Sequence, residues 1–334
     1  MPIPTNLITG FLGVGKTTAI GRLLEKRPPS ERWAVLVNEF GQVGVDDMLL
    51  DAEGVAIRQV PGGCLCCVSS QAFTVGLNRL IRHERPDRIL IEPSGLGHPA
   101  RIIESLSGDA YGGVLTLNAT ITLMDARHLA SERHRSHGTW IDQIRLADVL
   151  VATKADLYTE DERSAFLDFA RTLPRPKPLL ALVTQGALDP DWLNLPRDPG
   201  RLARCISAHA PPDAHHHADR NEPHHADSAT FWQVAESRSD GYIGSSWLFA
   251  AGTRFREDAL RDLLTGLDCE RVKALLPTDA GWLRCNRAAR EGECVSCKAP
   301  ADGRGRLEIA DPAGVHIPRL ERQLREALIR TARE

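Results

Sequence analysis

The sequence predicts an α/β fold in which helices flank a mostly parallel sheet, followed by a smaller C-terminal α+β domain. Two observations lead to this prediction. Short apolar runs alternate with helical patterns over most of the chain, which is typical of a parallel sheet covered on both faces. The first run, residues 3–9, leads into a glycine-rich turn and a helix over 18–27. The later runs are 33–37, 55–60, 88–91, 119–124, 148–152 and 179–183, with helical patterns at 70–83, 99–107 and 159–173.

The composition changes between residues 196 and 228, where Pro, Asp, Ala and His are frequent and large apolar residues are few. This change predicts a first domain over 1–200, a histidine-rich linker over 201–228 and an α+β domain over 229–334. In the last domain we expect strands at 231–235, 242–250, 271–275, 281–286 and 306–310, and helices at 257–267 and 316–333.

Composition also limits the partners. The chain has 334 residues, and 41 Lys+Arg against 44 Asp+Glu give a net charge of −3, which argues against nucleic acid as the main partner. No apolar stretch approaches the roughly 20 residues of a membrane helix, and the N-terminus lacks a signal-peptide pattern. We therefore expect a cytoplasmic protein with no membrane partner, whose eight cysteines are metal ligands or buried thiols rather than disulfides.

A phosphate-binding loop follows the first strand. The pattern Gly10-x4-Gly15-Lys16-Thr17 has the strand before and the helix after that distinguish a P-loop from a chance glycine-rich turn. Backbone N–H groups would cradle phosphate oxygens, Lys16 would reach the β- and γ-phosphates, and Thr17 would place its hydroxyl on Mg²⁺. The fold class is therefore that of a P-loop NTPase. The nucleotide-binding residues predicted here are Gly10, Gly13, Val14, Gly15, Lys16, Thr17 and Thr18.

The strand at 88–91 delivers a second phosphate-side element. Glu92 falls at the carboxyl end of that strand, where ligands bind in open α/β sheets. It could hold Mg²⁺ through water or orient the attacking water, and Gly95 could offer its N–H to the γ-phosphate. The alternative for Glu92 is an ordinary acid at the end of a strand.

A base-recognition element follows the strand at 148–152. Thr153-Lys154-Ala155-Asp156 resembles the Asn-Lys-x-Asp element of GTPases, with Thr153 in the Asn position. Asp156 would accept from the two guanine N–H groups, and the stem of Lys154 would lie along the ring, which favours GTP over ATP. A hydroxyl cannot reproduce an amide's paired donor and acceptor, so the preference could be looser than usual. The alternative is a helix start capped by Lys and Asp. A further guanine-contacting loop would fall at 184–188.

Three cysteines in four residues form the predicted metal site. Cys64, Cys66 and Cys67 follow two glycines that allow the thiols to gather around one point. Three thiolates on Zn²⁺ leave one open position, which suits transfer better than a closed structural site. Cu(I) also suits these ligands, and Co²⁺ would bind more weakly. A structural zinc knuckle, a redox site and buried thiols are the alternatives.

Two further groups could bind metal. The histidine-rich tract within residues 201–228 could capture metal near the three cysteines, or it could be only a hydrophilic linker. Cys294 and Cys297 have metal-compatible spacing, with Cys285 upstream, but a lone Cys-x-x-Cys pair is common. The candidate auxiliary metal ligands in this tract are His215, His216, His217, His224 and His225.

Taken together, the motifs at 10–18, 38–46, 64–67, 92–95 and 153–156 resemble the CobW-type metallochaperone GTPases, relatives of the urease and hydrogenase nickel chaperones. The similarity covers most of the chain and is greatest to the zinc-binding YeiR-like branch. It implies that Asp46 is a switch acid near Mg²⁺, catalytic together with Lys16 and Glu92, and that Glu39 is a supplementary zinc ligand.

The resemblance implies a zinc chaperone or insertase that couples GTP binding and hydrolysis to metal delivery to a client metalloprotein. Hydrolysis should be slow without a partner, because no water-orienting Gln or arginine finger is evident. A nucleotide- or metal-dependent homo-oligomer is compatible with this. The alternatives are a cobalt or iron chaperone for a cobalamin-related or nitrile hydratase-type client, a zinc store with vestigial hydrolysis, and a P-loop kinase.

Overall fold

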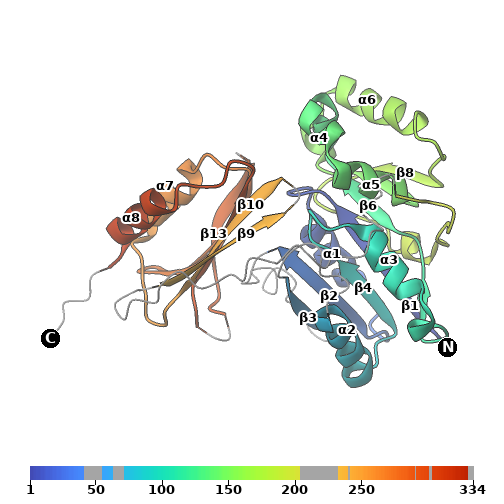
Figure 1. Cartoon of the computed structure of the whole chain (residues 1–334), viewed down its shortest axis with the longest axis horizontal. Coiled ribbons are helices and arrows are strands. Elements are labelled where there is room, and N and C mark those ends of the chain that lie inside the picture. Colours follow the sequence, from blue (N-terminus) through green and yellow to red (C-terminus); the bar gives the residue numbers. More distant parts are fainter. Residues whose placement is uncertain are drawn as a thin grey trace, which may run out of the picture. The chain divides into compact units, whose positions relative to one another are not determined.

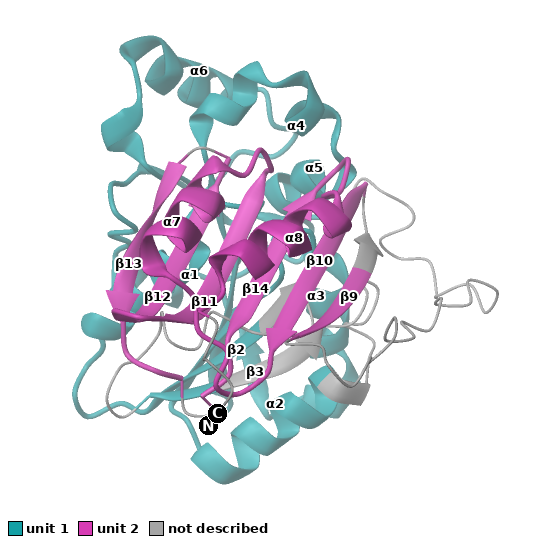
Figure 2. Ribbon diagram, turned by 90° about the vertical axis from the view of Figure 1, so that its left-hand side faces the viewer, with its two compact units in different colours: residues 1–40, 49–215 teal, residues 41–48, 216–334 magenta. Residues whose placement is uncertain are grey.

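The computed structural model describes residues 1–40, 55–62, 71–203, 232–239, 241–289, 291–300 and 303–329. These residues divide into two compact units, one before and one after the tract that begins at residue 204 (Figure 2). No helix in the described ranges is long and apolar enough to cross a membrane.

The first unit contains an eight-stranded sheet in the order β3-β2-β4-β1-β6-β7-β8, with β5 paired to β1. Every strand pair in it is parallel, which confirms the predicted sheet. The strands are β1 Ile3–Gly10, β2 Trp33–Phe40, β3 Ala56–Gly62, β4 Arg88–Glu92, β5 Leu115–Leu117, β6 Ile121–Met124, β7 Val149–Ala152 and β8 Leu179–Leu182.

Helices flank this sheet (Figure 1). One core lies where Leu36 and Ile91 of the strands meet Phe73 of α2 and Ile102 of α3, all fully buried. Strands β4, β6 and β7 are buried along their whole length, as expected for parallel strands covered on both faces. The helices are α1 Lys16–Glu25, α2 Gln71–Glu84, α3 Pro99–Ser107, α4 Glu132–Ser136, α5 Gly138–Leu146 and α6 Glu160–Arg171, with 3-10 turns η3 Asp109–Tyr111, η4 Ala126–Ala130, η5 Ala155–Leu157 and η6 Pro190–Asn194.

The second unit contains a six-stranded antiparallel sheet in the order β13-β12-β11-β14-β10-β9, which confirms the predicted α+β domain. Helices α7 and α8 cover one face of this sheet (Figure 2). Its core gathers aromatic side chains from β10 with leucines from both helices, among them Trp247, Phe249, Leu260 and Leu324. The elements are β9 Trp232–Ser239, β10 Tyr242–Phe249, α7 Glu257–Gly266, β11 Arg271–Thr278, β12 Gly281–Ala288, β13 Glu291–Cys297, β14 Arg306–Asp311 and α8 Ile317–Ala327.

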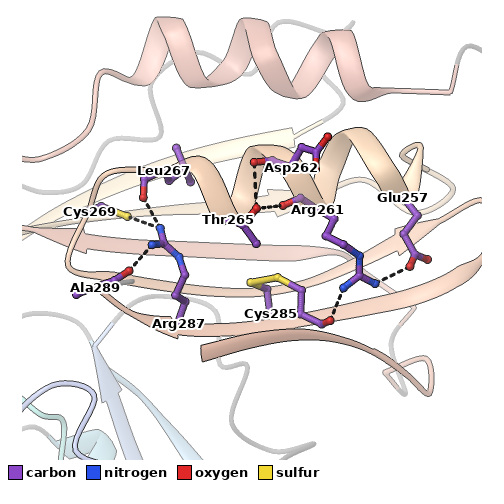
Figure 3. Close-up of a disulfide and its surroundings, with 10 residues drawn as sticks. Glu257, Arg261, Asp262, Thr265, Leu267, Cys269, Cys285, Arg287 and Ala289 are labelled. Atoms are coloured by element: carbon purple, nitrogen blue, oxygen red, sulfur yellow. Dashed lines mark hydrogen bonds and ion pairs between the residues drawn. A yellow bond between two sulfur atoms is a disulfide. The ribbon is translucent and has the colours of Figure 1, made fainter. Parts of the chain in front are cut away.

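The cysteines of the second unit correct the expectation that no disulfide forms. Cys285 and Cys294 are direct partners across β12 and β13, with Cα atoms 4.0 Å apart, and their sulfur atoms are bonded (Figure 3). Closely spaced antiparallel partners bring two side chains within bonding distance, and this pairing cannot be read from the spacing of the cysteines. Cys297 is a free, half-buried thiol. Cys269 is also free, and burial raises its pKa to about 11.

Candidate functional site

The glycine-rich loop between β1 and α1 is held between two neighbouring segments. Gly10 has φ +143°, and a Cβ there would lie 2.3 Å from the carbonyl oxygen of Leu123 in β6. A Cβ on Gly95 would lie 2.9 Å from the backbone nitrogen of Leu12. Because both approaches are to backbone atoms, only glycine fits at either position. The loop is therefore fixed between the segment after β4 and the end of β6.

The lysine and threonine of the loop both make hydrogen bonds beside it. The Nζ atom of Lys16 donates to the carbonyl oxygen of Phe11 at 3.2 Å, so its side chain turns back over the loop. The hydroxyl of Thr17 donates to both carboxylate oxygens of Glu92, at 2.9 and 3.2 Å. Hydroxyl and carboxylate oxygens are the hard ligands that Mg²⁺ takes in proteins. These side chains fit the predicted phosphate and Mg²⁺ roles.

Gln143 positions the loop that follows Glu92. This buried side chain of α5 donates from Nε2 to the carbonyl oxygens of Gly95, at 3.0 Å, and Gly97, at 3.4 Å. Sequence reasoning missed Gln143, since its partners are 46 and 48 residues away and no motif contains it.

The base-recognition element is attached directly to the phosphate loop. The Thr153 hydroxyl lies 2.7 Å from the carbonyl oxygen of Val14 and 3.2 Å from that of Met124. A buried threonine thus links the end of β7 to the middle of the P-loop. This attachment needs one donor, which a hydroxyl supplies as well as an amide does.

The two residues predicted to contact guanine differ in environment. Lys154 adopts the left-handed conformation, with φ 57°, and its Nζ atom lies 3.5 Å from a carboxylate oxygen of Asp125. Asp156 is exposed in the middle of η5, where a ligand can reach it. Asp125 was missed by sequence reasoning, although it directly follows the apolar strand β6, much as Glu92 is the last residue of β4, and this similar position was the available signal.

The loop at 184–188 packs on the helix that begins at the phosphate loop. Gly186 has φ +71°, and a Cβ there would lie 2.9 Å from both the N and Cα atoms of Ala19 in α1. The Nζ atom of Lys26 donates to the carbonyl oxygen of Leu188 at 2.9 Å. The loop therefore lies beside the P-loop helix, and its contact with guanine stays a prediction.

A histidine cluster packs against Phe11 of the phosphate loop. The Phe11 ring meets His134 and His137 edge-on, at centroid distances of 5.4 and 4.8 Å, and His128 stacks on His134 at 3.9 Å. Burial first, and then the nearby charge of His134, lower the pKa of His128 to about 4. His128 is therefore neutral at physiological pH.

The predicted zinc ligands lie mostly outside the described residues. Cys64, Cys66, Cys67 and the five histidines at 215–217, 224 and 225 lie there, while Glu39 is described only through its backbone in β2. Asp46, the predicted Mg²⁺ ligand, also lies outside the described residues. Across the ranges that the structure describes, no group of three or more His, Cys, Asp or Glu side chains could hold a metal ion. The ligand assignments therefore stay predictions.

The glycine-rich loop lies between a strand and a helix. Lys16 folds back over it, and Thr17 is hydrogen-bonded to the carboxylate at the end of β4. These features define a P-loop nucleotide-binding protein. Residues 4–180 match the model of the CobW/HypB/UreG nucleotide-binding domain. The chain belongs to this family, and the family prediction is confirmed.

Two curated relatives come from Escherichia coli (strain K12). The zinc chaperone YeiR is 38% identical over 289 residues, which covers 85% of each chain. The zinc chaperone YjiA is 34% identical over 168 residues, covering 48% of this chain and 52% of that protein. The crystal structure of Zn(II)-bound YjiA GTPase from E. coli aligns with a TM-score of 0.42 at 19% identity, covering 98% of this chain and 99% of that one.

Proposed function

We propose that this chain is a GTP-hydrolysing zinc chaperone, in which the nucleotide state controls capture and release of the metal. Lys16 binds the β- and γ-phosphates, Thr17 and Asp46 hold Mg²⁺, and Glu92 orients the attacking water. Mg²⁺, when bound, neutralises charge on the phosphate oxygens. The hydrogen bond from Thr17 to Glu92 supports these roles, because it joins the Mg²⁺ side of the site to the hydrolytic side.

The base pocket consists of Thr153, Lys154 and Asp156. An exposed carboxylate at Asp156 can accept from the N1–H and the exocyclic amine of guanine, whereas adenine offers no such pair of donors. Replacing Asp156 with Asn should therefore reduce the preference for GTP over ATP. Equal affinity of the wild-type protein for the two nucleotides would contradict this assignment.

The observation that carries the zinc proposal is the register of β4, β2 and β3. Val37 of β2 pairs with Glu92 of β4, and Glu39, two residues later, pairs with Pro61 of β3. Carboxyl ends of parallel strands meet at one edge of a sheet. The backbones of Glu39 and of the strand that leads to Cys64 are therefore neighbours at the edge that carries Glu92.

This arrangement supports a direct link between nucleotide and metal. Cys64, Cys66 and Cys67 supply three thiolates for Zn²⁺, and Glu39 fills or vacates the fourth position as the γ-phosphate orders its segment. Zinc is the cargo, passed to a client metalloprotein in the cytoplasm. Because the two affinities are linked, zinc must alter GTP affinity by the factor by which GTP alters zinc affinity.

The test is a zinc titration against a chromogenic chelator, with GTP, with GDP and without nucleotide. We expect zinc affinity to differ between nucleotide states in the wild type and to fall strongly in Cys66→Ala. Cys297→Ala is the matched control, because it removes a free thiol from the second unit. Equal zinc affinity in all nucleotide states, together with GTP turnover that zinc does not change, would exclude the chaperone function.

Three extensions of the proposal have their own measurements. Repeating the titration with Co²⁺ tests the cobalt alternative, and the same protein lacking His215, His216, His217, His224 and His225 tests whether the tract captures metal. Light scattering with GTP and zinc tests for a homo-oligomer.

A further inference from the structure

Asp125 is a buried carboxylate that directly follows β6, and it is 1% exposed. Arg127 donates to one of its oxygens from the backbone N, at 3.1 Å, and from Nε, at 2.9 Å, and to the other from Nη2 at 2.6 Å. Burial raises the pKa of Asp125, but the Arg127 hydrogen bond, the charge that His128 carries when its ring is protonated at low pH, and the charges of Lys154 and Arg127 together lower it below its ordinary value. Asp125 is therefore ionised at neutral pH.

Asp125 and the next residue, Ala126, are joined to the predicted base-recognition loop at two points. The first is the ion pair with Lys154, across 3.5 Å. The second runs through Tyr158, whose hydroxyl accepts from the backbone N of Ala126 at 2.8 Å and donates to the carbonyl oxygen of Thr153. The segments after β6 and β7 are thus held together around Lys154.

Lys154 is the residue for which this restraint matters. A non-glycine residue in the left-handed region is strained by about 1–2 kcal/mol, and here φ is 57°. An anchored ammonium group also limits the rotamers of the lysine stem, so less side-chain entropy remains to be lost when a ligand packs against it. An anchored Lys154 would present a preformed surface and hold Asp156, two residues later, in position.

We propose that Asp125 is a positioning residue that acts through Lys154 and sets the selectivity for guanine over adenine. The proposal rests on the base-pocket roles proposed above for Lys154 and Asp156. Guanine binding depends on the placement of Asp156, whereas adenine gains little from it. Loosening the loop should therefore weaken GTP binding more than ATP binding, and should leave the hydrolytic groups beside Glu92 in place.

The experiment compares Asp125→Asn, Lys154→Met and the double variant, with kcat and KM measured for GTP and ATP. Asn keeps the shape and one acceptor of Asp125 but lacks its charge, and Met keeps most of the lysine stem. We expect each single variant to raise KM for GTP by about tenfold, with kcat unchanged and a smaller GTP-to-ATP preference. If Asp125 acts through Lys154, the double variant is no worse than the poorer single variant.

Asp148 provides the matched control. It is also 1% exposed and pairs with Arg201 at 3.0 Å, but it precedes β7 and so lies at the opposite end of the sheet from Asp125. Asp148→Asn should lower the thermal stability and leave the GTP-to-ATP preference unchanged. Equal shifts in preference for Asp125→Asn and Asp148→Asn, or effects that multiply in the double variant, would overturn the role of Asp125.

Asp156→Asn separates this proposal from the one on which it rests. If Asp156→Asn changes the preference and Asp125→Asn does not, Asp125 has no positioning role and the base pocket stands. If neither variant changes the preference, the base pocket itself is wrongly assigned, and the positioning role is overturned with it.

Discussion

Gly186 offers a sharp test of how the loop at 184–188 is held against the phosphate loop. Its φ of +71° would strain alanine by roughly 1–2 kcal/mol. A Cβ there would also lie 2.9 Å from two backbone atoms of Ala19, which cannot rotate away, and such overpacking adds about 1–3 kcal/mol. Together these two effects should destabilise the first unit by roughly 2–5 kcal/mol in Gly186→Ala. Alanine also reduces the conformational entropy of the unfolded chain, which offsets about 0.4–1 kcal/mol of this loss.

Gly113 is the matched control for this substitution. It has φ +76° in the same unit, and no atom lies within 4 Å of its added Cβ, so alanine there meets only the backbone strain. Urea unfolding should give Gly186→Ala a free energy of unfolding about 1–3 kcal/mol lower than that of Gly113→Ala. Only the first variant should raise KM for GTP. Equal destabilisation of the two variants would refute the contact with α1 as the cause.

Three other perturbations have definite expected outcomes. Thr153→Val should weaken GTP binding by about 1–3 kcal/mol, because it leaves the Val14 carbonyl oxygen without its donor at 2.7 Å. Thr153→Ser should restore binding, and GTP titration checks both. Because the pKa of His128 is about 4 when folded and about 6.5 when unfolded, its contribution to stability is complete above pH 6.5 and is lost as pH falls toward 4. Between these two pH values, the free energy of unfolding of His128→Phe should fall less with decreasing pH than that of the wild type. Reducing the Cys285–Cys294 disulfide, which spans nine positions, should cost about 2.6 kcal/mol by loop entropy. A Cys285→Ala, Cys294→Ala variant should show no response to reductant.

Local pattern was sufficient to predict the phosphate loop and its strand. The glycine positions and the change of period from strand to helix are properties of neighbouring residues, so they can be read from one sequence. Glu92 was predictable for the same reason, since the apolar run before it fixes where β4 ends. Its hydrogen bond with Thr17 spans 75 residues and was not predicted.

Contacts that depend on register or on distant segments could not be predicted in the same way. Cys285 and Cys294 meet because β12 and β13 pair in one register, and a shift by one residue would place them on opposite faces. Gln143 reaches Gly95 only after α5 has packed near the end of β4. One sequence specifies these elements but does not state which side chains they bring together.

The role of Thr153 can be interpreted only when its local motif is considered together with the order of the strands in the sheet. The sequence suggested that a hydroxyl in the Asn position would loosen base recognition, because an amide has a donor and an acceptor. In the folded chain β7 lies beside β6, and β6 lies beside β1, so the end of β7 reaches the P-loop at Val14. Because the two segments are this close, one hydrogen-bond donor on a short side chain is sufficient to link them, and the buried Thr153 hydroxyl supplies it. The Thr153 hydroxyl therefore restrains the loop, and we expect discrimination between bases to depend on Asp156 and on the Asp125–Lys154 pair.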